Sequence, residues 1–93
     1  MIVNPNSKLS WQYHHRRSEI WKVTIGEIKV VTSDDDVERN NVLLKQGEEI
    51  NISQEERHRI IGTDGYAVVA EIWIHTDKDN PSDEDDIVRI QDD

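Results

Sequence analysis

Hydrophobic and polar residues alternate along most of this chain, which is the periodicity of half-buried β-strands. In residues 19–25, for example, Trp21, Val23 and Ile25 lie on the same face as Glu19. No stretch of the sequence carries a helical apolar stripe over three turns. The pattern therefore predicts an all-β protein.

Turn residues divide this pattern into about seven or eight short strands. The Gly-Thr-Asp-Gly sequence of residues 62–65 predicts a hairpin, and the change of apolar phase around Gly26 predicts a tight hairpin or a bulge. Residues 66–75 are apolar on both faces over much of their length, so we expect them to form the most central strand. So many short strands in fewer than 100 residues indicate a small sandwich or barrel. The expected strands cover residues 10–14, 19–25, 28–30, 37–44, 48–52, 58–61, 66–75 and 87–90.

The composition limits the size and chemistry of the protein. With 93 residues, 34% of them hydrophobic and none of them Phe, residues 1–93 form one domain with a modest core, which excludes a large enzyme. The absence of cysteine excludes disulfides, thiolate metal sites and cysteine nucleophiles. Neither a signal peptide nor an apolar run of about 20 residues is present, so we expect a cytoplasmic protein without a membrane partner.

The charge is strongly negative and unevenly distributed. The net charge is −9, which disfavours nucleic acid as a partner. An acidic C-terminal segment, residues 77–93, holds eight acidic and two basic residues, so the other 76 residues carry only −3. A local cluster of arginine and lysine could therefore still bind an anionic small molecule.

Candidate metal ligands lie close together near the N-terminus. Period-two geometry places Gln12 and His14 on one strand face, and a turn at residues 15–18 would bring Glu19 back beside them. His58, which begins a strand after a polar loop, could complete a set of two imidazoles, one carboxylate and one amide. The alternative from spacing alone is that these are polar residues on an exposed sheet face.

Three segments resemble one family. Residues 12–21, followed by Val23 and Gly26, resemble the first cupin motif of type II mannose-6-phosphate (phosphomannose) isomerases, a family that includes the C-terminal isomerase domain of mannose-1-phosphate guanylyltransferases. Residues 47–59 are similar to the second cupin motif, with His58 at the position of its metal-binding histidine. Residues 84–89, Glu-Asp-Asp-Ile-Val-Arg, look like a C-terminal segment characteristic of this family. The resemblance implies a small cupin, a jelly-roll barrel also called a double-stranded β-helix.

The same resemblance implies a metal-dependent enzyme. Gln12, His14, Glu19 and His58 would bind one divalent metal ion, and this ligand set accepts Zn, Mn, Fe, Co or Ni. The activity implied is the interconversion of mannose 6-phosphate and fructose 6-phosphate, in which a proton moves between C1 and C2 through an enediolate. The expected small-molecule partner is therefore a sugar phosphate.

Two residues are catalytic candidates. Arg17 lies two residues before Glu19, so both side chains enter one pocket if the strand already begins there, and its fixed charge suits a phosphate, a hydroxyl or the enediolate. A solvated turn arginine is the alternative. Glu71 lies in the apolar strand 66–75, where a carboxylate is costly unless it is paired or useful, which makes it a candidate base. An ion pair is the equal alternative.

Two further residues are candidates for substrate binding. Trp21 shares the face of Glu19 and could line the pocket, although a packing role in a core without Phe is the preferred interpretation. Arg89 could reach the phosphate or could pair with the adjacent acidic run. That run, residues 83–86, is interpreted as solvated charge.

The sequence also departs from the family pattern. Glu55 replaces a glycine of the second motif, and we expect it to reshape the loop before His58. The family segment normally continues into Tyr-Gly-Arg, whereas this sequence ends at Asp93, so activity would be weak or lost if that arginine holds the substrate. The other replacements are Arg16, Ile20, Ser53 and Gly62.

Two other functions stay open. The missing arginine favours a non-catalytic cupin that binds metal and sugar, while a different metal-dependent cupin reaction is a third possibility. We also expect a homodimer, because residues 1–3 look like a short strand that pairs with a second chain and closes an exposed sheet edge.

Overall fold

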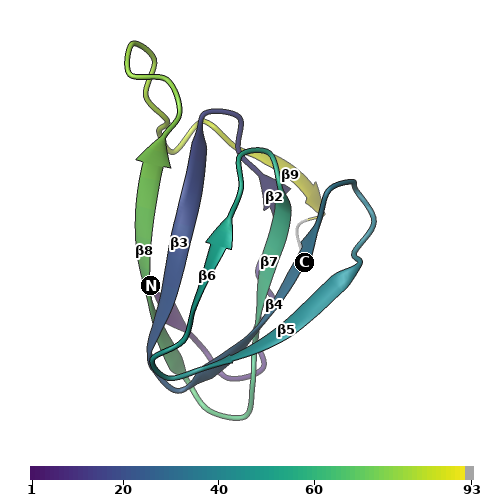
Figure 1. Ribbon diagram of the computed structural model, residues 1–93. Helices are drawn as coiled ribbons and strands as arrows, with labels where there is room; N and C mark the ends of the chain where they lie inside the picture. Colours follow the sequence, from purple (N-terminus) through teal and green to yellow (C-terminus); the bar gives the residue numbers. More distant parts are fainter. Residues whose placement is uncertain (92–93) are drawn as a thin grey trace.

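The structure is a computed structural model in which residues 1–91 are described, and these residues form strands and turns but no helix (Figure 1). No segment within them is therefore a helix long and apolar enough to cross a membrane. The strands are β1 (Ile2–Val3), β2 (Trp11–Tyr13), β3 (Arg17–Ile25), β4 (Glu27–Ser33), β5 (Asn40–Lys45), β6 (Glu49–Ile52), β7 (Arg57–Gly62), β8 (Ala67–His75) and β9 (Val88–Gln91).

The strands form two antiparallel sheets that face each other. One has the order β1-β8-β3-β6 and the other the order β5-β4-β7-β2-β9. Consecutive strands lie in opposite sheets except for β4 and β5, which form a hairpin. This arrangement confirms the predicted all-β jelly roll.

Several turns predicted as hairpins join the two sheets instead. Residues 62–65 connect β7 of the five-stranded sheet to β8 of the four-stranded sheet, so the predicted hairpin there is wrong. Gly26 likewise passes the chain from β3 to β4 in the other sheet. The predicted irregularity near it is present as a shift of register between Val23 and Ile25 against β8.

The hydrophobic core fills one end of the space between the sheets. Along β3 the inward-facing residues change from Arg17 and Glu19 to Trp21 and Val23, so the strand divides the interior into a polar end and an apolar end. The apolar end buries side chains from both sheets. Its buried members are Val3, Trp21, Val23, Ile28, Val30, Leu44, Ile52, Ile60, Ala67 and Val69.

One expectation about strand positions needs correction. The strand predicted to be most central, β8, pairs with β3 along most of its length, but β1 covers only Ala67 and Val68 on its other side. Its second half is therefore exposed, and β3 occupies the interior of the sheet. Residues 2–3 do form a short strand, and it pairs with β8 of their own chain.

The acidic segment is only partly solvated. Most of residues 77–91 are exposed, but Ser82 and Asp86 are buried, which corrects the interpretation of residues 83–86 as solvated charge. Asp92 and Asp93, which also belong to the predicted segment, lie outside the described residues.

Two glycines allow a matched test of how the chain passes between the sheets. Gly26 and Gly47 both have positive φ, of 77° and 89°. A Cβ at Gly26 would lie 2.5 Å from the Tyr66 carbonyl oxygen, whereas a Cβ at Gly47 would meet nothing within 4 Å. We therefore expect Gly47→Ala to cost about 1 kcal/mol of stability and Gly26→Ala about 2–4 kcal/mol, as measured by urea unfolding. Equal losses would contradict close packing at Gly26.

Candidate metal centre

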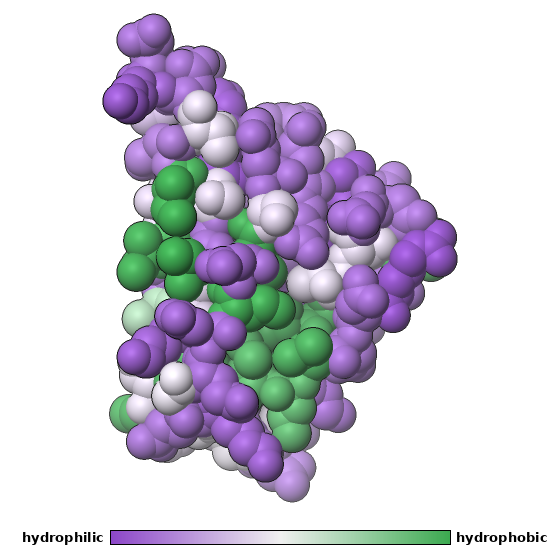
Figure 2. Space-filling view, viewed as in Figure 1, coloured by the Kyte–Doolittle hydropathy of each residue, from purple (hydrophilic) through white to green (hydrophobic). Residues whose placement is uncertain are grey.

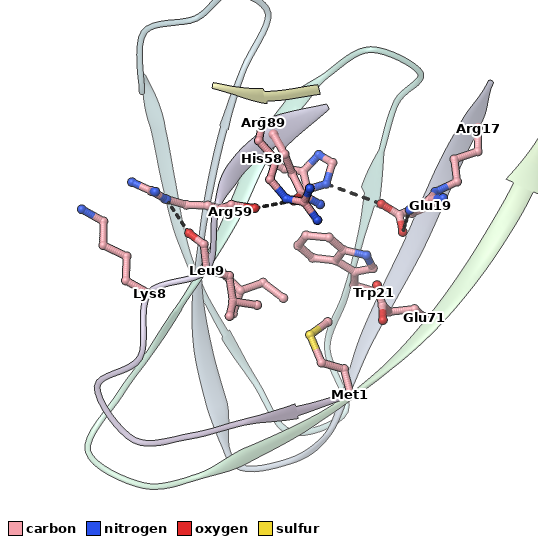
Figure 3. A pocket seen from close by; sticks show the side chains of 13 residues that line it. Met1, Lys8, Leu9, Arg17, Glu19, Trp21, His58, Arg59, Glu71 and Arg89 are labelled. Atoms are coloured by element: carbon pink, nitrogen blue, oxygen red, sulfur yellow. Dashed lines mark hydrogen bonds and ion pairs between the residues drawn. The ribbon is translucent and has the colours of Figure 1, made fainter. Parts of the chain in front are cut away.

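Three buried side chains meet at the polar end of the interior, and two of them, Glu19 and His58, are drawn in Figure 3. His14 follows β2, Glu19 lies on β3 and His58 lies on β7, so both sheets contribute. Glu19 Oε2 is 3.6 Å from His14 Nε2 and 3.5 Å from His58 Nε2. One potential ligand atom from each residue lies within 4.8 Å of the others.

Backbone carbonyls orient both imidazoles. His14 Nδ1 donates to the carbonyl oxygen of Asp86 at 2.7 Å, and His58 Nδ1 donates to that of Glu56 at 2.9 Å. With the proton held on Nδ1, each ring presents the lone pair of Nε2 towards Glu19. A metal-binding histidine usually donates the N–H of its other ring nitrogen in this way.

Burial controls the charge of these groups. It lowers the pKa of His58 to about 4 and also lowers the pKa of His14, which the Arg17 guanidinium depresses further. Burial raises the pKa of Glu19, with Arg17 acting in the opposite direction. Both histidines are therefore neutral at pH 7, which is the form that binds a metal.

The three residues fit a divalent ion. Glu19 Oε2 and His58 Nε2 are buried and have no hydrogen-bond partner, an arrangement that costs free energy unless another group satisfies them. Two imidazoles and a carboxylate are ligands suited to Zn, Mn, Fe, Co or Ni. A site with three such ligands would leave coordination positions open for water or a substrate.

The fourth predicted ligand, Gln12, lies beside this group. Its Nε2 atom is 3.4 Å from His14 Nε2, while its Oε1 atom accepts a hydrogen bond from the Ser10 hydroxyl. As an amide ligand it would have to turn its oxygen towards His14. Gln12 is close enough to join the three candidate metal ligands, and its role stays a prediction.

Arg17 begins β3 and enters the pocket, as the sequence suggested. Its Nη2 atom is 3.1 Å from His14 Nε2 and 3.6 Å from Glu19 Oε1. The guanidinium also lies over the Trp73 ring, 3.6 Å from its centroid, and its Nη1 atom donates to Ser82. Arg17 is therefore a fixed, buried cation rather than a solvated turn residue.

A cavity of about 440 Å³ opens beside these residues (Figure 3). Glu71, Arg89 and Trp21 line it, so the structure places these three candidates together with Gln12, Arg17, Glu19 and His58. Trp21 is buried and packs edge-on against His58 with ring centroids 5.1 Å apart, which makes it a wall of the site. The other lining residues are Met1, Lys8, Leu9, Ser10, Arg59 and Ile60.

Asp86 is the important residue that sequence reasoning missed. Its carboxylate accepts hydrogen bonds from the backbone N–H groups of His15 and Arg16 and from the Ser82 hydroxyl. Burial opposes ionisation, but these hydrogen bonds lower the pKa of Asp86 to about 2. Asp86 therefore fixes the turn that carries His14. The only available signal was its place in the family-specific segment, residues 84–89.

Glu55 ties the second ligand loop to the first. Its φ of 63° is in the left-handed region, and its N–H donates to the carbonyl of His14 at 3.0 Å. The loop thus has the backbone conformation that favours glycine. The expectation that Glu55 reshapes this loop finds no support in that conformation.

The family can be assigned from the whole chain. A sequence profile of the family described as Mannose-6-phosphate isomerase C-terminal matches residues 1–92. The chain belongs to this family. The resemblance inferred from the three motifs is therefore confirmed, and the neighbouring solved structures are cupin domains. Among curated protein sequences, none matches this cupin.

Solved structures support the fold. The cupin is similar to the Drosophila melanogaster CENP-C cupin domain, with a TM-score of 0.69, 25% identity, and coverage of 80% of this chain and 57% of that one. A Bacillus halodurans protein has a TM-score of 0.76 and 13% identity, with 88% and 64% covered. A Cupin 2 conserved barrel domain protein from Salinispora arenicola has a TM-score of 0.62 and 23% identity, with coverage of 77% of this chain and 56% of that one. This cupin thus spans under two thirds of the length of each of them.

The buried neutral histidine predicts a pH dependence of stability. His58 stays neutral in the folded protein down to about pH 4, but it takes up a proton below about pH 6.5 when unfolded. Between these two pH values the unfolded state binds more protons than the folded state. The contribution of His58 to the free energy of unfolding is therefore fully present above pH 6.5, and roughly 3 kcal/mol of it is lost as the pH falls towards 4. In urea unfolding of metal-free protein, His58→Gln should flatten the profile in this window. An unchanged slope would show that His58 is protonated in the folded state.

Substitution of Asp86 is expected to lower the affinity for a divalent ion although all candidate ligands are kept. Asp86→Asn replaces one acceptor oxygen by a donor facing the N–H groups of the His14 turn, so the divalent-ion affinity should fall about 10–100-fold. Competition against a chromophoric chelator would measure it. Asp85→Asn is the matched control because Asp85 is an exposed neighbour in the same segment. Equal affinities of the two variants would contradict the positioning role of Asp86.

Proposed function

We propose that this cupin is a metal-dependent isomerase that interconverts mannose 6-phosphate and fructose 6-phosphate in the cytoplasm. The observation that carries the proposal is the cavity, because the candidate metal ligands Glu19 and His58 share its wall with Arg17, Arg89 and Glu71. One space thus offers a metal position, fixed positive charge and a carboxylate. Its volume of about 440 Å³ is within the range for small-ligand sites.

The charge of the cavity suits a sugar phosphate. The protein carries −9 overall, yet Lys8, Arg17, Arg59 and Arg89 all line this cavity. Arg59 is engaged with the Leu9 carbonyl and faces Glu38, so its charge acts at a distance. We assign the phosphate to the exposed Arg89 side chain. Arginine is well suited to this role because its planar donors match phosphate oxygens.

The reaction needs a base and a stabiliser of negative oxygen. A bound divalent ion would supply Lewis-acid stabilisation of the enediolate oxygens. Glu71 would take the proton from C2 of open-chain mannose 6-phosphate and return it to C1, while the hydroxyl proton on the C2 oxygen passes to the C1 oxygen, which gives fructose 6-phosphate. Arg17, whose Nη2 atom lies among the ligand atoms, would donate to the same oxygens. Trp21, a buried wall of the site, would limit access of water to it.

The proposal can be tested by NMR of mannose 6-phosphate in D₂O with protein loaded separately with Zn, Mn, Fe, Co or Ni. We expect fructose 6-phosphate to form, with deuterium entering at the carbon that Glu71 reprotonates. Glu71→Gln should keep the metal and lose about 10²–10⁴-fold in kcat, because it removes the base. His58→Gln should lose metal and activity together.

The outcomes separate the candidate functions. Absence of conversion with all five ions would overturn the isomerase. If mannose 6-phosphate still bound to the metal-loaded protein, the non-catalytic metal- and sugar-binding cupin would replace it. Conversion without exchange of deuterium would contradict the role of Glu71 as a base that exchanges its proton with water.

A further inference from the structure

The edge of β8 from Glu71 to His75, called here the open edge, pairs with no strand among residues 1–91. β3 pairs with the other side of this segment, and β1 reaches only Ala67 and Val68. Val69 N–H donates to the Met1 carbonyl across this edge, so alternate residues turn their backbone groups the same way. Glu71, Trp73 and His75 therefore present their N–H and C=O groups along the open edge, which makes it a template for another strand.

The side chains of the open edge favour association. Ile72 and Ile74 are 57% and 46% exposed on the outer face of the sheet, and Ile20 lies directly opposite Ile72 on β3. Figure 2 shows hydrophobic side chains gathered at the left margin, where Figure 1 places β8. Exposed edges usually carry lysine, proline or a bulge that prevents pairing. From Ala67 to His75, β8 has no lysine or proline, and Glu71 is its single carboxylate.

We propose that two copies of this chain pair through their open edges, antiparallel, with Trp73 on the two-fold axis. Trp73 is the centre of the open edge, so this register pairs the whole segment with itself. It places Trp73 opposite the partner's Trp73 and Glu71 opposite the partner's His75, all with backbone groups directed at each other. Two four-stranded sheets then become one continuous sheet across the dimer.

Charge and polarity select this register. Glu71 faces the partner's His75, whose Nδ1 would already accept the N–H of Ser82 as it does in this chain, so that its proton is on Nε2 and can be donated to the carboxylate. Ile72 lies opposite the partner's Ile74, and both are removed from water. A register centred on Glu71 would set two carboxylates against each other, and one centred on His75 would leave Glu71 unpaired.

The dimer would complete the rim of the cavity. Glu71 lines the cavity from the open edge, so the partner's His75 would lie beside it. The partner would thus contribute a residue next to the site, independently of which reaction the site performs.

Cysteine cross-linking tests the register, because the chain has no cysteine of its own. Ile72→Cys and Ile74→Cys are purified separately and then mixed under mild oxidation. In the proposed register, residue 72 is directly opposite the partner's residue 74, with Cα atoms about 4.5 Å apart, within disulfide range. Residue 72 is diagonal to the partner's own residue 72, at about 7–8 Å. The mixture should therefore give several-fold more linked dimer than either variant alone, and cross-linking that is equal in all three samples would overturn the register.

Sedimentation velocity tests the association itself. Wild-type protein should be dimeric at tens of micromolar, and Ile74→Glu should be monomeric because it places a carboxylate in the apolar contact. Leu43→Glu is the matched control: Leu43 is 45% exposed, lies on β5 of the other sheet and faces Lys29 across the strand pair. It should stay dimeric. A monomeric wild-type protein, or an Ile74→Glu variant as dimeric as the control, would overturn the proposal. Circular dichroism of both variants would verify that they are folded.

Discussion

The geometry of the candidate metal centre depends on one buried carboxylate, that of Asp86. The carboxylate oxygens accept hydrogen bonds from the backbone N–H groups of His15 and Arg16. The backbone carbonyl of the same residue accepts a hydrogen bond from Nδ1 of His14. A turn between β2 and β3 would otherwise leave these polar groups to water, and His14 would be free to rotate. Because one residue satisfies both the turn and the ring, the ligand is held in position before any ion binds.

This constraint explains why the C-terminal segment folds back over the open end of the barrel. Ser82 donates to Asp86 and accepts from Arg17, and the carbonyl of Asp83 accepts from Arg17 as well. The acidic segment therefore closes the polar end of the interior, where Glu19 and His58 could not be buried against apolar side chains without cost. The apolar end supplies the hydrophobic burial that stabilises the domain. β3 spans both ends, which links the candidate ligand Glu19 to the core through Trp21.

Much of this architecture could be predicted from the sequence. The period-two pattern located most strands to within a few residues, and the family motifs identified His14, Glu19 and His58, which the structure brings within 4.8 Å. Alternation shows which face of a strand is buried, but it carries no information about which sheet the strand joins. The turn residues at 62–65 therefore predict a hairpin, although β7 and β8 lie in opposite sheets.

Part of the site could not be predicted because it depends on contacts between residues far apart in the sequence. Asp86 lies in an acidic run that solvated charge explains equally well, and its burial depends on partners about 70 positions away in the sequence. The exposure of β8 was missed for a related reason, because a strand that is apolar on both faces predicts burial on both faces. The second half of β8 is instead an exposed edge of its sheet. A strand that is apolar on both faces is expected at the centre of a sheet, but it is equally expected at an edge that pairs with another chain.

Arg17 connects the charge of the centre to the class of ligand it would accept. Its Nη2 atom donates to His14 Nε2, the atom that would also face a metal ion. The charges of Arg17 and Glu19 balance each other, so a divalent ion added to this buried pair would leave an excess of two positive charges. In a site of low polarity such an excess lowers the affinity for the ion alone and raises the affinity for an anionic oxygen bound with it. The arginine would therefore favour joint binding of the ion with an enediolate or another anionic ligand over binding of the ion alone.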